Sequence, residues 1–151
     1  MKTLDKKVAI ITGAGSGIGR AIALLYSSEG AIVVLTDVDD KGGNDTLNEI
    51  KSKGGEAIFI KADTSNTQDS ERVVNETMNK YSALHISVNN AGISGPLSFT
   101  GDYPIEGWNK VISINLSGVF YGMRYQIPAM LKSGGGSIVN IASILGKVGA
   151  K

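Results

Sequence analysis

One stretch near the start of the chain decides its fold: Val8-Ala9-Ile10-Ile11-Thr12-Gly13-Ala14-Gly15-Ser16-Gly17-Ile18-Gly19. The first five residues form a short β-branched run, which favours a strand buried on both faces. The glycines that follow allow a tight turn, and from Gly17 onward apolar residues recur at helical spacing. A strand, a glycine-rich loop and a helix in this order predict a dinucleotide-binding motif, in which the helix amino terminus faces a pyrophosphate. A plain glycine-rich turn is the alternative.

The alternation of strand-like and helix-like segments continues along the chain. Further short apolar runs predict strands at residues 32–35, 57–60, 86–88 and 137–141. This order predicts an α/β fold, a single dinucleotide-binding domain of Rossmann type over residues 1–151, with a doubly wound parallel sheet and right-handed crossovers. The sheet would finish on a buried type of strand, so we expect its last strands to be missing. Pro128 should bend or break the long helix that is predicted between residues 105 and 132.

Composition limits the partners and the compartment. The chain has 151 residues, of which 42% are hydrophobic and 19% charged, as in globular domains. A formal net charge of +1 without a basic block gives no reason to expect nucleic acid or a membrane as partner. The absence of cysteine, of a signal-like start and of a long apolar run predicts a soluble, cytoplasmic protein. His85 is the only histidine and has no clustered ligands, so we expect no metal site and a structural role for this residue.

Asp37 follows the second predicted strand and is the candidate for binding the adenosine ribose of a dinucleotide. A carboxylate at this place accepts hydrogen bonds from the adenosine ribose hydroxyls of a dinucleotide. It would also repel the 2′-phosphate of NADP by about 1–4 kcal/mol at a separation of about 4 Å. This corresponds to a preference for NAD of roughly ten- to several-hundred-fold if no cation compensates, and Arg20 is a weak candidate for that cation. A helix-capping or solvated aspartate is the alternative.

Four motifs, in order and at suitable separations, resemble the classical short-chain dehydrogenase/reductase family. They are the loop Thr12–Gly19, the segment Asn89-Asn90-Ala91-Gly92, Asn115 in the long helix and Ser143 after the fifth strand. The resemblance covers essentially the whole chain. It implies an NAD(H)-dependent oxidoreductase that interconverts a secondary alcohol and a ketone, both small molecules, by hydride transfer. It also implies a homo-oligomer, a dimer or tetramer, packed through the long fourth and fifth helices.

The resemblance assigns a role to each motif. Asp63 would bind the adenine amino group, Ile114 would lie near the adenine, and residues 90–92 would line the cofactor ribose and support the sheet. Asn115 would bend its helix and hold a water in a proton relay, and Ser143 would hydrogen-bond the substrate oxygen. Ordinary turns and local main-chain hydrogen bonds are the alternatives for these residues. The complete cofactor-binding set is Gly13, Ser16, Gly17, Ile18, Gly19, Asp37, Val38, Asp63, Thr64, Asn90, Ala91, Gly92 and Ile114.

The chain departs from the family at its carboxyl end. The family's general acid–base is a Tyr that follows the catalytic Ser by about a dozen residues, with its pKa lowered by a Lys four residues later. Here the sequence ends at Lys151, and none of its five tyrosines precedes a lysine by four. We therefore expect a truncated sequence that is inactive alone. A non-catalytic NAD-binding fragment or pseudo-enzyme, and a regulatory or interaction module of the same fold, stay open as alternatives.

Overall fold

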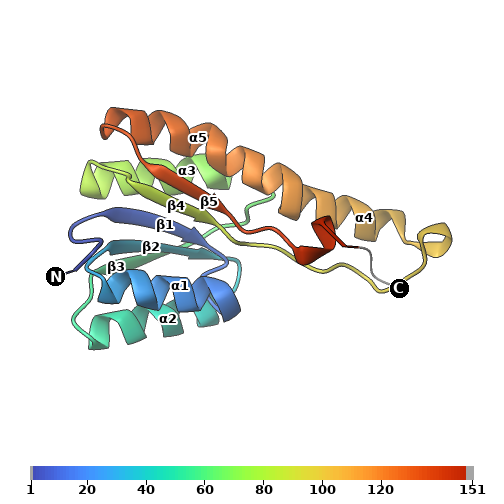
Figure 1. Cartoon of the computed structure of the whole chain (residues 1–151), viewed down its shortest axis with the longest axis horizontal. Helices are drawn as coiled ribbons and strands as arrows, with labels where there is room; N and C mark the ends of the chain where they lie inside the picture. Colours follow the sequence, from blue (N-terminus) through green and yellow to red (C-terminus); the bar gives the residue numbers. More distant parts are fainter. Residues whose placement is uncertain (1, 149–151) are drawn as a thin grey trace.

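The sheet follows the predicted order and direction of strands. The computed structural model describes residues 2–148, so Met1 and residues 149–151, among them Lys151, lie outside the description. In the described part all strand pairs are parallel and the order is β3-β2-β1-β4-β5, as Figure 1 shows. The classical doubly wound sheet has the same order for its first five strands, which confirms the predicted fold class. The strands are β1 (Val8–Thr12), β2 (Ile32–Asp37), β3 (Ala57–Lys61), β4 (Ile86–Asn89) and β5 (Ser137–Asn140).

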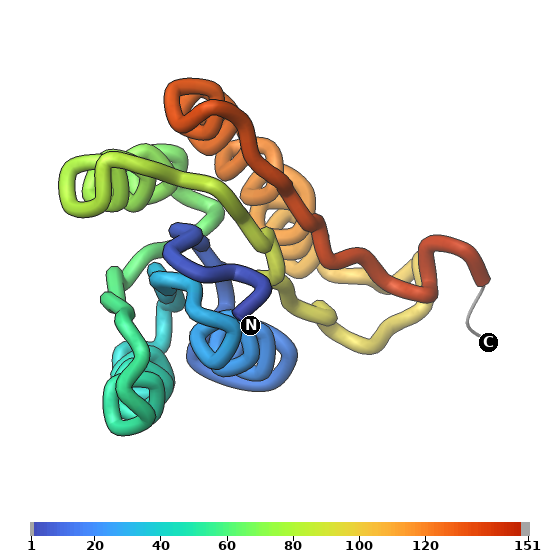
Figure 2. The backbone as a smooth tube through the Cα atoms, turned by 60° about the vertical axis from the view of Figure 1, so that its left-hand side comes forward, coloured from blue at the N-terminus to red at the C-terminus, as the bar shows by residue number. Residues whose placement is uncertain are grey.

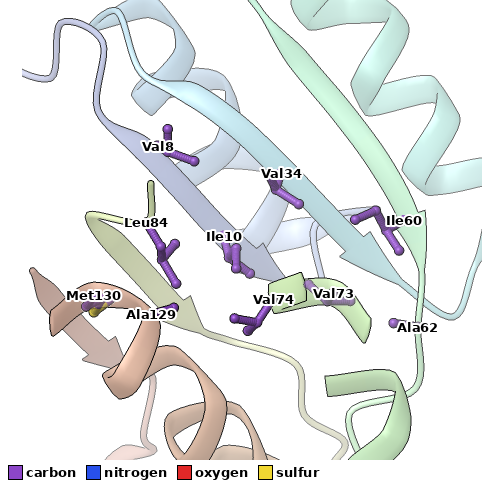
Figure 3. Close-up of a cluster of buried hydrophobic side chains, with 10 residues drawn as sticks. All are labelled: Val8, Ile10, Val34, Ile60, Ala62, Val73, Val74, Leu84, Ala129 and Met130. Atoms are coloured by element: carbon purple, nitrogen blue, oxygen red, sulfur yellow. The ribbon is translucent and has the colours of Figure 1, made fainter. Parts of the chain in front are cut away.

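Helices cover both faces of the sheet. The helices α1 (Gly17–Ser28) and α2 (Asp40–Ser52) lie on one face, and α3 (Thr67–Tyr81) and α5 (Gly118–Lys132) lie on the other (Figure 1). Alternate side chains of β1 enter two separate clusters, because successive residues of a strand point to opposite faces. Ile10 packs in the cluster beneath α3 and α5, which Figure 3 shows, whereas Ile11 packs in the cluster beneath α1 and α2. Every residue of β1 is buried, as its continuous apolar run predicts.

The long helical region is interrupted, but not where the sequence suggested. It consists of α4 (Ile105–Ile112), a π-helical segment η2 (Ser113–Ser117) and α5. The helix does not break at Pro128, because α5 continues to Lys132, and a bend there stays a prediction. Proline removes one helical N–H, and here both Pro128 and Arg124, four residues earlier, are exposed, so the released carbonyl can face water. The irregularity lies instead around Asn115, where the family resemblance implied a bend.

The segments that follow β4 and β5 extend beyond the sheet on the same side. Figures 1 and 2 show the chain after β4 running out toward α4, and the chain after β5 running beside it to the 3₁₀ turn η3 (Ile144–Gly146). Because all strands are parallel, this is the edge at which every strand has its carboxyl end. Ligands of open α/β sheets bind at this edge, near the point where the strand order reverses, which here lies between β1 and β4.

No helix within residues 2–148 has both the length and the apolar character needed to cross a membrane. Nor does that part of the chain contain a group of three or more His, Cys, Asp or Glu side chains arranged to hold a metal ion.

Candidate cofactor site

A cleft of about 1040 Å³ lies at the carboxyl edge of the sheet. This volume is at the upper end of the range for small-molecule sites, about 300–1,000 Å³. Each strand contributes at least one wall residue at or soon after its carboxyl end, among them Gly13, Asp37, Asp63, Asn90 and Ser143. The parallel topology thus gathers motifs that are far apart in the sequence.

The cleft collects nearly all of the residues predicted for the site. Gly19 is the exception: it is buried within α1, beside the Gly13 carbonyl and the Asn90 side chain. A Cβ at position 19 would collide with both, so this glycine allows α1 to pack on the loop. The predicted residues that line the cleft are Gly13, Ser16, Gly17, Ile18, Asp37, Val38, Asp63, Thr64, Asn90, Ala91, Gly92, Ile114, Asn115 and Ser143.

The glycine-rich loop delivers the amino terminus of α1 to the cleft. Gly13 and Gly17 have φ values of +65° and +51°, a conformation that side chains with a Cβ rarely adopt. Ser16 is the N-cap residue of α1, and its side chain makes no capping hydrogen bond. The first-turn N–H groups of α1 therefore lack a side-chain partner, and with the helix dipole they favour an anion at this position.

Asp37 places a fixed carboxylate in the cleft. One of its oxygens, Oδ2, accepts the Gly15 N–H at 2.8 Å, and the other, Oδ1, accepts the Asp39 N–H at 3.0 Å. These two bonds hold the carboxylate at the end of β2 and against the glycine-rich loop. Arg20, considered above as a compensating cation, pairs with Glu49 at 2.6 Å and is not part of the cleft wall.

A second connection joins the glycine-rich loop to the loop after β4. The Thr12 hydroxyl oxygen accepts the N–H groups of Asn90 at 2.9 Å and Ala91 at 3.0 Å. In return, the Asn90 amide group donates to the carbonyl oxygens of Thr12 at 2.9 Å and Gly13 at 3.3 Å. We call these four bonds the Thr12–Asn90 clamp. No role was predicted for the Thr12 side chain, although its position directly before the glycine-rich loop indicates that it lies at the edge of the site.

Asn115 is exposed, and its side chain binds main chain. Its Oδ1 accepts the Ile93 N–H at 2.9 Å and its Nδ2 donates to the Ile93 carbonyl at 2.8 Å. The alternative of a main-chain hydrogen bond thus describes the Asn115 side chain, which lies within the π-helical segment η2. Single-turn π segments occur frequently at functional sites.

Ser143 is the wall residue contributed by the chain after β5. It is exposed and is the N-cap residue of η3, where its hydroxyl oxygen accepts the Leu145 N–H at 3.1 Å. The loop-cap alternative is therefore present in the structure. It is compatible with a second role, because a hydroxyl group that accepts one bond still has a proton to donate.

A parallel sheet with a glycine-rich loop, a helix amino terminus and a fixed carboxylate at its carboxyl edge defines a dinucleotide-binding α/β domain. Residues 7–151 match the family described as short chain dehydrogenase. The chain belongs to this family.

Similar proteins include several dehydrogenases. The chain is 46% identical to a cyclohexanol dehydrogenase from Acinetobacter sp. (strain SE19), a match that covers 96% of this chain and 58% of the relative. Among solved structures, an NAD⁺-bound xylitol dehydrogenase superposes with a TM-score of 0.95 at 30% identity, covering 99% of this chain and 57% of the other. A short-chain dehydrogenase/reductase from Burkholderia phymatum in complex with NAD gives a TM-score of 0.94 at 35% identity, covering 99% and 53%. The chain thus spans little more than half the length of these relatives.

Proposed function

We propose that the protein is an NAD(H)-dependent oxidoreductase that interconverts a small secondary alcohol and a ketone. One observation carries the proposal: the cleft combines a helix amino terminus without a side-chain cap with a carboxylate fixed on the sugar side by two main-chain N–H groups. The first feature suits a pyrophosphate and the second suits unphosphorylated ribose hydroxyls. The names of relatives, among them a cyclohexanol dehydrogenase and a 3beta-hydroxysteroid dehydrogenase, support the alcohol–ketone chemistry. The cytoplasmic location belongs to the same proposal and rests on the cysteine-free composition.

The wall residues divide along the length of a bound dinucleotide. The loop from Gly13 to Ile18 would hold the pyrophosphate, and Asp37 with Val38 would contact the adenosine ribose. Asp63, Thr64 and Ile114 would surround the adenine. The remaining segment of the wall, Asn90-Ala91-Gly92, would line the ribose on the nicotinamide side.

The reacting end of the site lies between the loops after β4 and β5. Bound NAD⁺ would supply the hydride acceptor, and the alcohol proton would pass to the family's general acid–base Tyr, which residues 1–151 do not include. Ser143 would donate its hydroxyl proton in a hydrogen bond to the substrate oxygen and so stabilise developing negative charge there. Asn115 would keep the Ile93 main chain, and with it one wall of the substrate region, in place.

An apolar stripe on the long helical region supports the proposed homo-oligomer. Leu116, Phe120, Ile127 and Leu131 recur at helical spacing and are between 46% and 71% exposed. A contiguous exposed apolar surface of this kind is typical of a protein interface. We therefore propose that this stripe forms a self-complementary contact in a dimer or tetramer, which sedimentation of the purified protein would detect.

The cofactor proposal can be tested by fluorescence titration with NADH and NADPH. The parent protein should bind NADH more tightly by roughly ten- to several-hundred-fold. The substitution Asp37→Asn removes the charge but keeps the shape, and it should reduce this preference by about tenfold or more. Asp45→Asn is a matched control, because Asp45 lies on the exposed side of α2 and, among residues 2–148, pairs only with Lys41. An unchanged preference in Asp37→Asn would contradict the proposed role of Asp37.

A turnover assay tests the rest of the proposal. Residues 1–151 alone should not turn over substrate. When they are joined to the family's catalytic Tyr and Lys, we expect NADH to form from NAD⁺ and cyclohexanol or a related secondary alcohol, and Ser143→Ala should lower this rate by about a hundredfold or more. Binding of NADH without turnover of any secondary alcohol or ketone, in a protein that also carries this Tyr and Lys, would contradict the oxidoreductase assignment while leaving the nucleotide site intact. Absence of NADH binding would contradict the whole proposal.

A further inference from the structure

The turn between β3 and α3 is held by two side chains that lie outside the cleft wall. Asp63, which does line the cleft, donates its main-chain N–H to Asp69 Oδ2 at 2.9 Å. Arg72 Nη2 donates to Asp69 Oδ1 at 2.8 Å and to the Lys61 carbonyl at 2.7 Å. Asp69 and Arg72 therefore connect the end of β3 and the first turns of α3 to the main chain of Asp63. We call this arrangement the Asp69–Arg72 brace.

The carboxylate of Asp63 is oriented by a separate pair of bonds. Its Oδ1 accepts the Ser65 N–H at 2.9 Å and the Ser65 hydroxyl at 2.7 Å. Within residues 2–148 no donor binds the other oxygen, Oδ2. With the main chain fixed by Asp69 and one carboxylate oxygen fixed by Ser65, the direction of the second oxygen is determined.

Helix capping alone does not explain the position of Asp69. Asn66 is the N-cap residue of α3, and its side chain already accepts the N–H groups of Gln68 and Asp69. An acidic residue three positions after the cap usually binds the N–H of the cap residue. Asp69 instead reaches back to Asp63, three residues before the cap, and the Asn66 N–H goes to the Asp63 carbonyl.

The ionisation of Asp69 is consistent with this arrangement. Its pKa is lowered, first by the hydrogen bond from the Asp63 N–H and then by the bond from Arg72. The group is therefore a carboxylate at neutral pH and accepts both bonds at once. Because the ion pair is partly exposed to solvent, with 43% of the Arg72 and 27% of the Asp69 side chain accessible, it contributes little to folding stability, and variants at this site should still fold.

We propose that Asp69 and Arg72 are positioning residues for adenine recognition, since they hold Asp63 with its second carboxylate oxygen toward the exocyclic amino group of the base. This inference rests on the proposed NAD-binding function, and it adds residues that themselves touch no cofactor. In this proposal two carboxylates recognise different parts of the adenosine half of the cofactor. Asp37 binds the ribose hydroxyls, and Asp63, held by the Asp69–Arg72 brace, binds the base.

The test compares NADH with reduced nicotinamide hypoxanthine dinucleotide, which carries a carbonyl oxygen in place of the adenine amino group. The parent should bind NADH about fivefold to tenfold more tightly than this analogue, the effect of one hydrogen bond to a charged acceptor. Asp69→Ala should reduce the ratio to within about twofold of unity, because Asp63 is no longer held. The preference for NADH over NADPH, which depends on Asp37, should stay as in the parent. A general loss of structure would lower both ratios.

Two further variants keep the test decisive. Arg72→Lys retains the charge but cannot bind Lys61 and Asp69 with one planar group, so it should lower the NADH-to-analogue ratio in part. Glu76→Ala removes the other carboxylate that Arg72 binds, at 3.2 Å, without touching Asp63, and it should leave the ratio unchanged. A parent-like ratio in Asp69→Ala and in Arg72→Lys, or a parent that binds the two dinucleotides equally, would overturn this inference alone. A parent that binds neither would overturn the proposed function as well.

Discussion

The two edges of the parallel sheet use polar side chains in different ways. At the carboxyl edge, Asp37 and Thr12 join main-chain segments that surround the cleft. At the amino edge, His85 Nδ1 accepts the Val8 N–H at 3.0 Å and the Ser133 hydroxyl oxygen accepts the Leu84 N–H at 2.9 Å, outside the cleft wall. Both edges satisfy main-chain groups, so a hydrogen-bonded polar side chain does not by itself mark a site. Glycines at positive φ lie at both edges, since Gly13 follows β1 whereas Gly30 precedes β2, so the open cleft is what distinguishes the carboxyl edge.

The largest loss of stability and of NADH binding is expected from a methyl group added to the glycine-rich loop. Gly19→Ala should destabilise the fold by about 3 kcal/mol or more and abolish NADH binding, because the new Cβ meets the Gly13 carbonyl and the Asn90 side chain. Gly17→Ala is the matched control for stability: it has open space for a Cβ and only its positive φ to oppose, which costs about 1 kcal/mol. Thermal or urea unfolding measures both. Equal losses in the two variants would show that packing of α1 on the loop is not the constraint.

A smaller effect is expected from the Thr12–Asn90 clamp. Thr12→Val keeps the shape but leaves the Asn90 and Ala91 N–H groups without their acceptor, which should cost about 2 kcal/mol of unfolding free energy and weaken NADH binding. Thr12→Ser retains the hydroxyl and should lose much less of both. If valine and serine behave alike in denaturant titrations, the hydroxyl does not hold the two loops together.

The smallest expected effect is at the amino edge, where the unfolding free energy should depend on pH through His85. Burial, assisted by Lys7, lowers the pKa of His85 below its ordinary 6.5, and its neutral Nδ1 accepts the Val8 N–H. Below pH 6.5 the unfolded chain therefore binds more protons, and stability falls as pH decreases through the pKa of the folded state. His85→Asn offers an acceptor that does not titrate. It should flatten the dependence of unfolding free energy on pH between about 7 and 5, while NADH affinity at pH 7.5 stays unchanged.

Two results would contradict this account of the amino edge. A parent and a His85→Asn variant with the same slope against pH would show that the Val8 bond does not depend on protonation of His85. A loss of NADH affinity in the variant would show that the two edges are not independent.

Most of the fold follows from local patterns in the sequence. The buried run Val8–Thr12 is a strand with the predicted bounds, and Asp39 is the N-cap residue of α2, where its side chain accepts the Lys41 N–H at 3.0 Å. These elements depend on apolar periodicity, glycine and capping residues within a few positions of each other. The sequence could not show that the helix continues through Pro128. The cost of proline in a helix depends on whether the released carbonyl can reach water, and this exposure is a property of the folded chain.

The site could be predicted less completely. Asp37, Asp63 and Asn90 follow predicted strands, and parallel topology brings the carboxyl ends of such strands together. The hydrogen-bond partners of these residues could not be predicted from the sequence. The Thr12–Asn90 clamp joins residues 78 apart in the sequence, and the bond from Gly15 to Asp37 spans 22. No local pattern records such pairs, because they arise only when separate strands align in register.

The account depends on the loop between Thr12 and Gly19 holding the pyrophosphate of a dinucleotide, with Asp37 on its sugar. A crystal structure of the protein grown with NADH measures this most directly. We predict pyrophosphate oxygens within hydrogen-bonding distance of main-chain N–H groups of this loop, and adenosine ribose hydroxyls on the Asp37 carboxylate. A nucleotide bound elsewhere, or a loop closed over Asp37 in crystals that contain NADH, would contradict it.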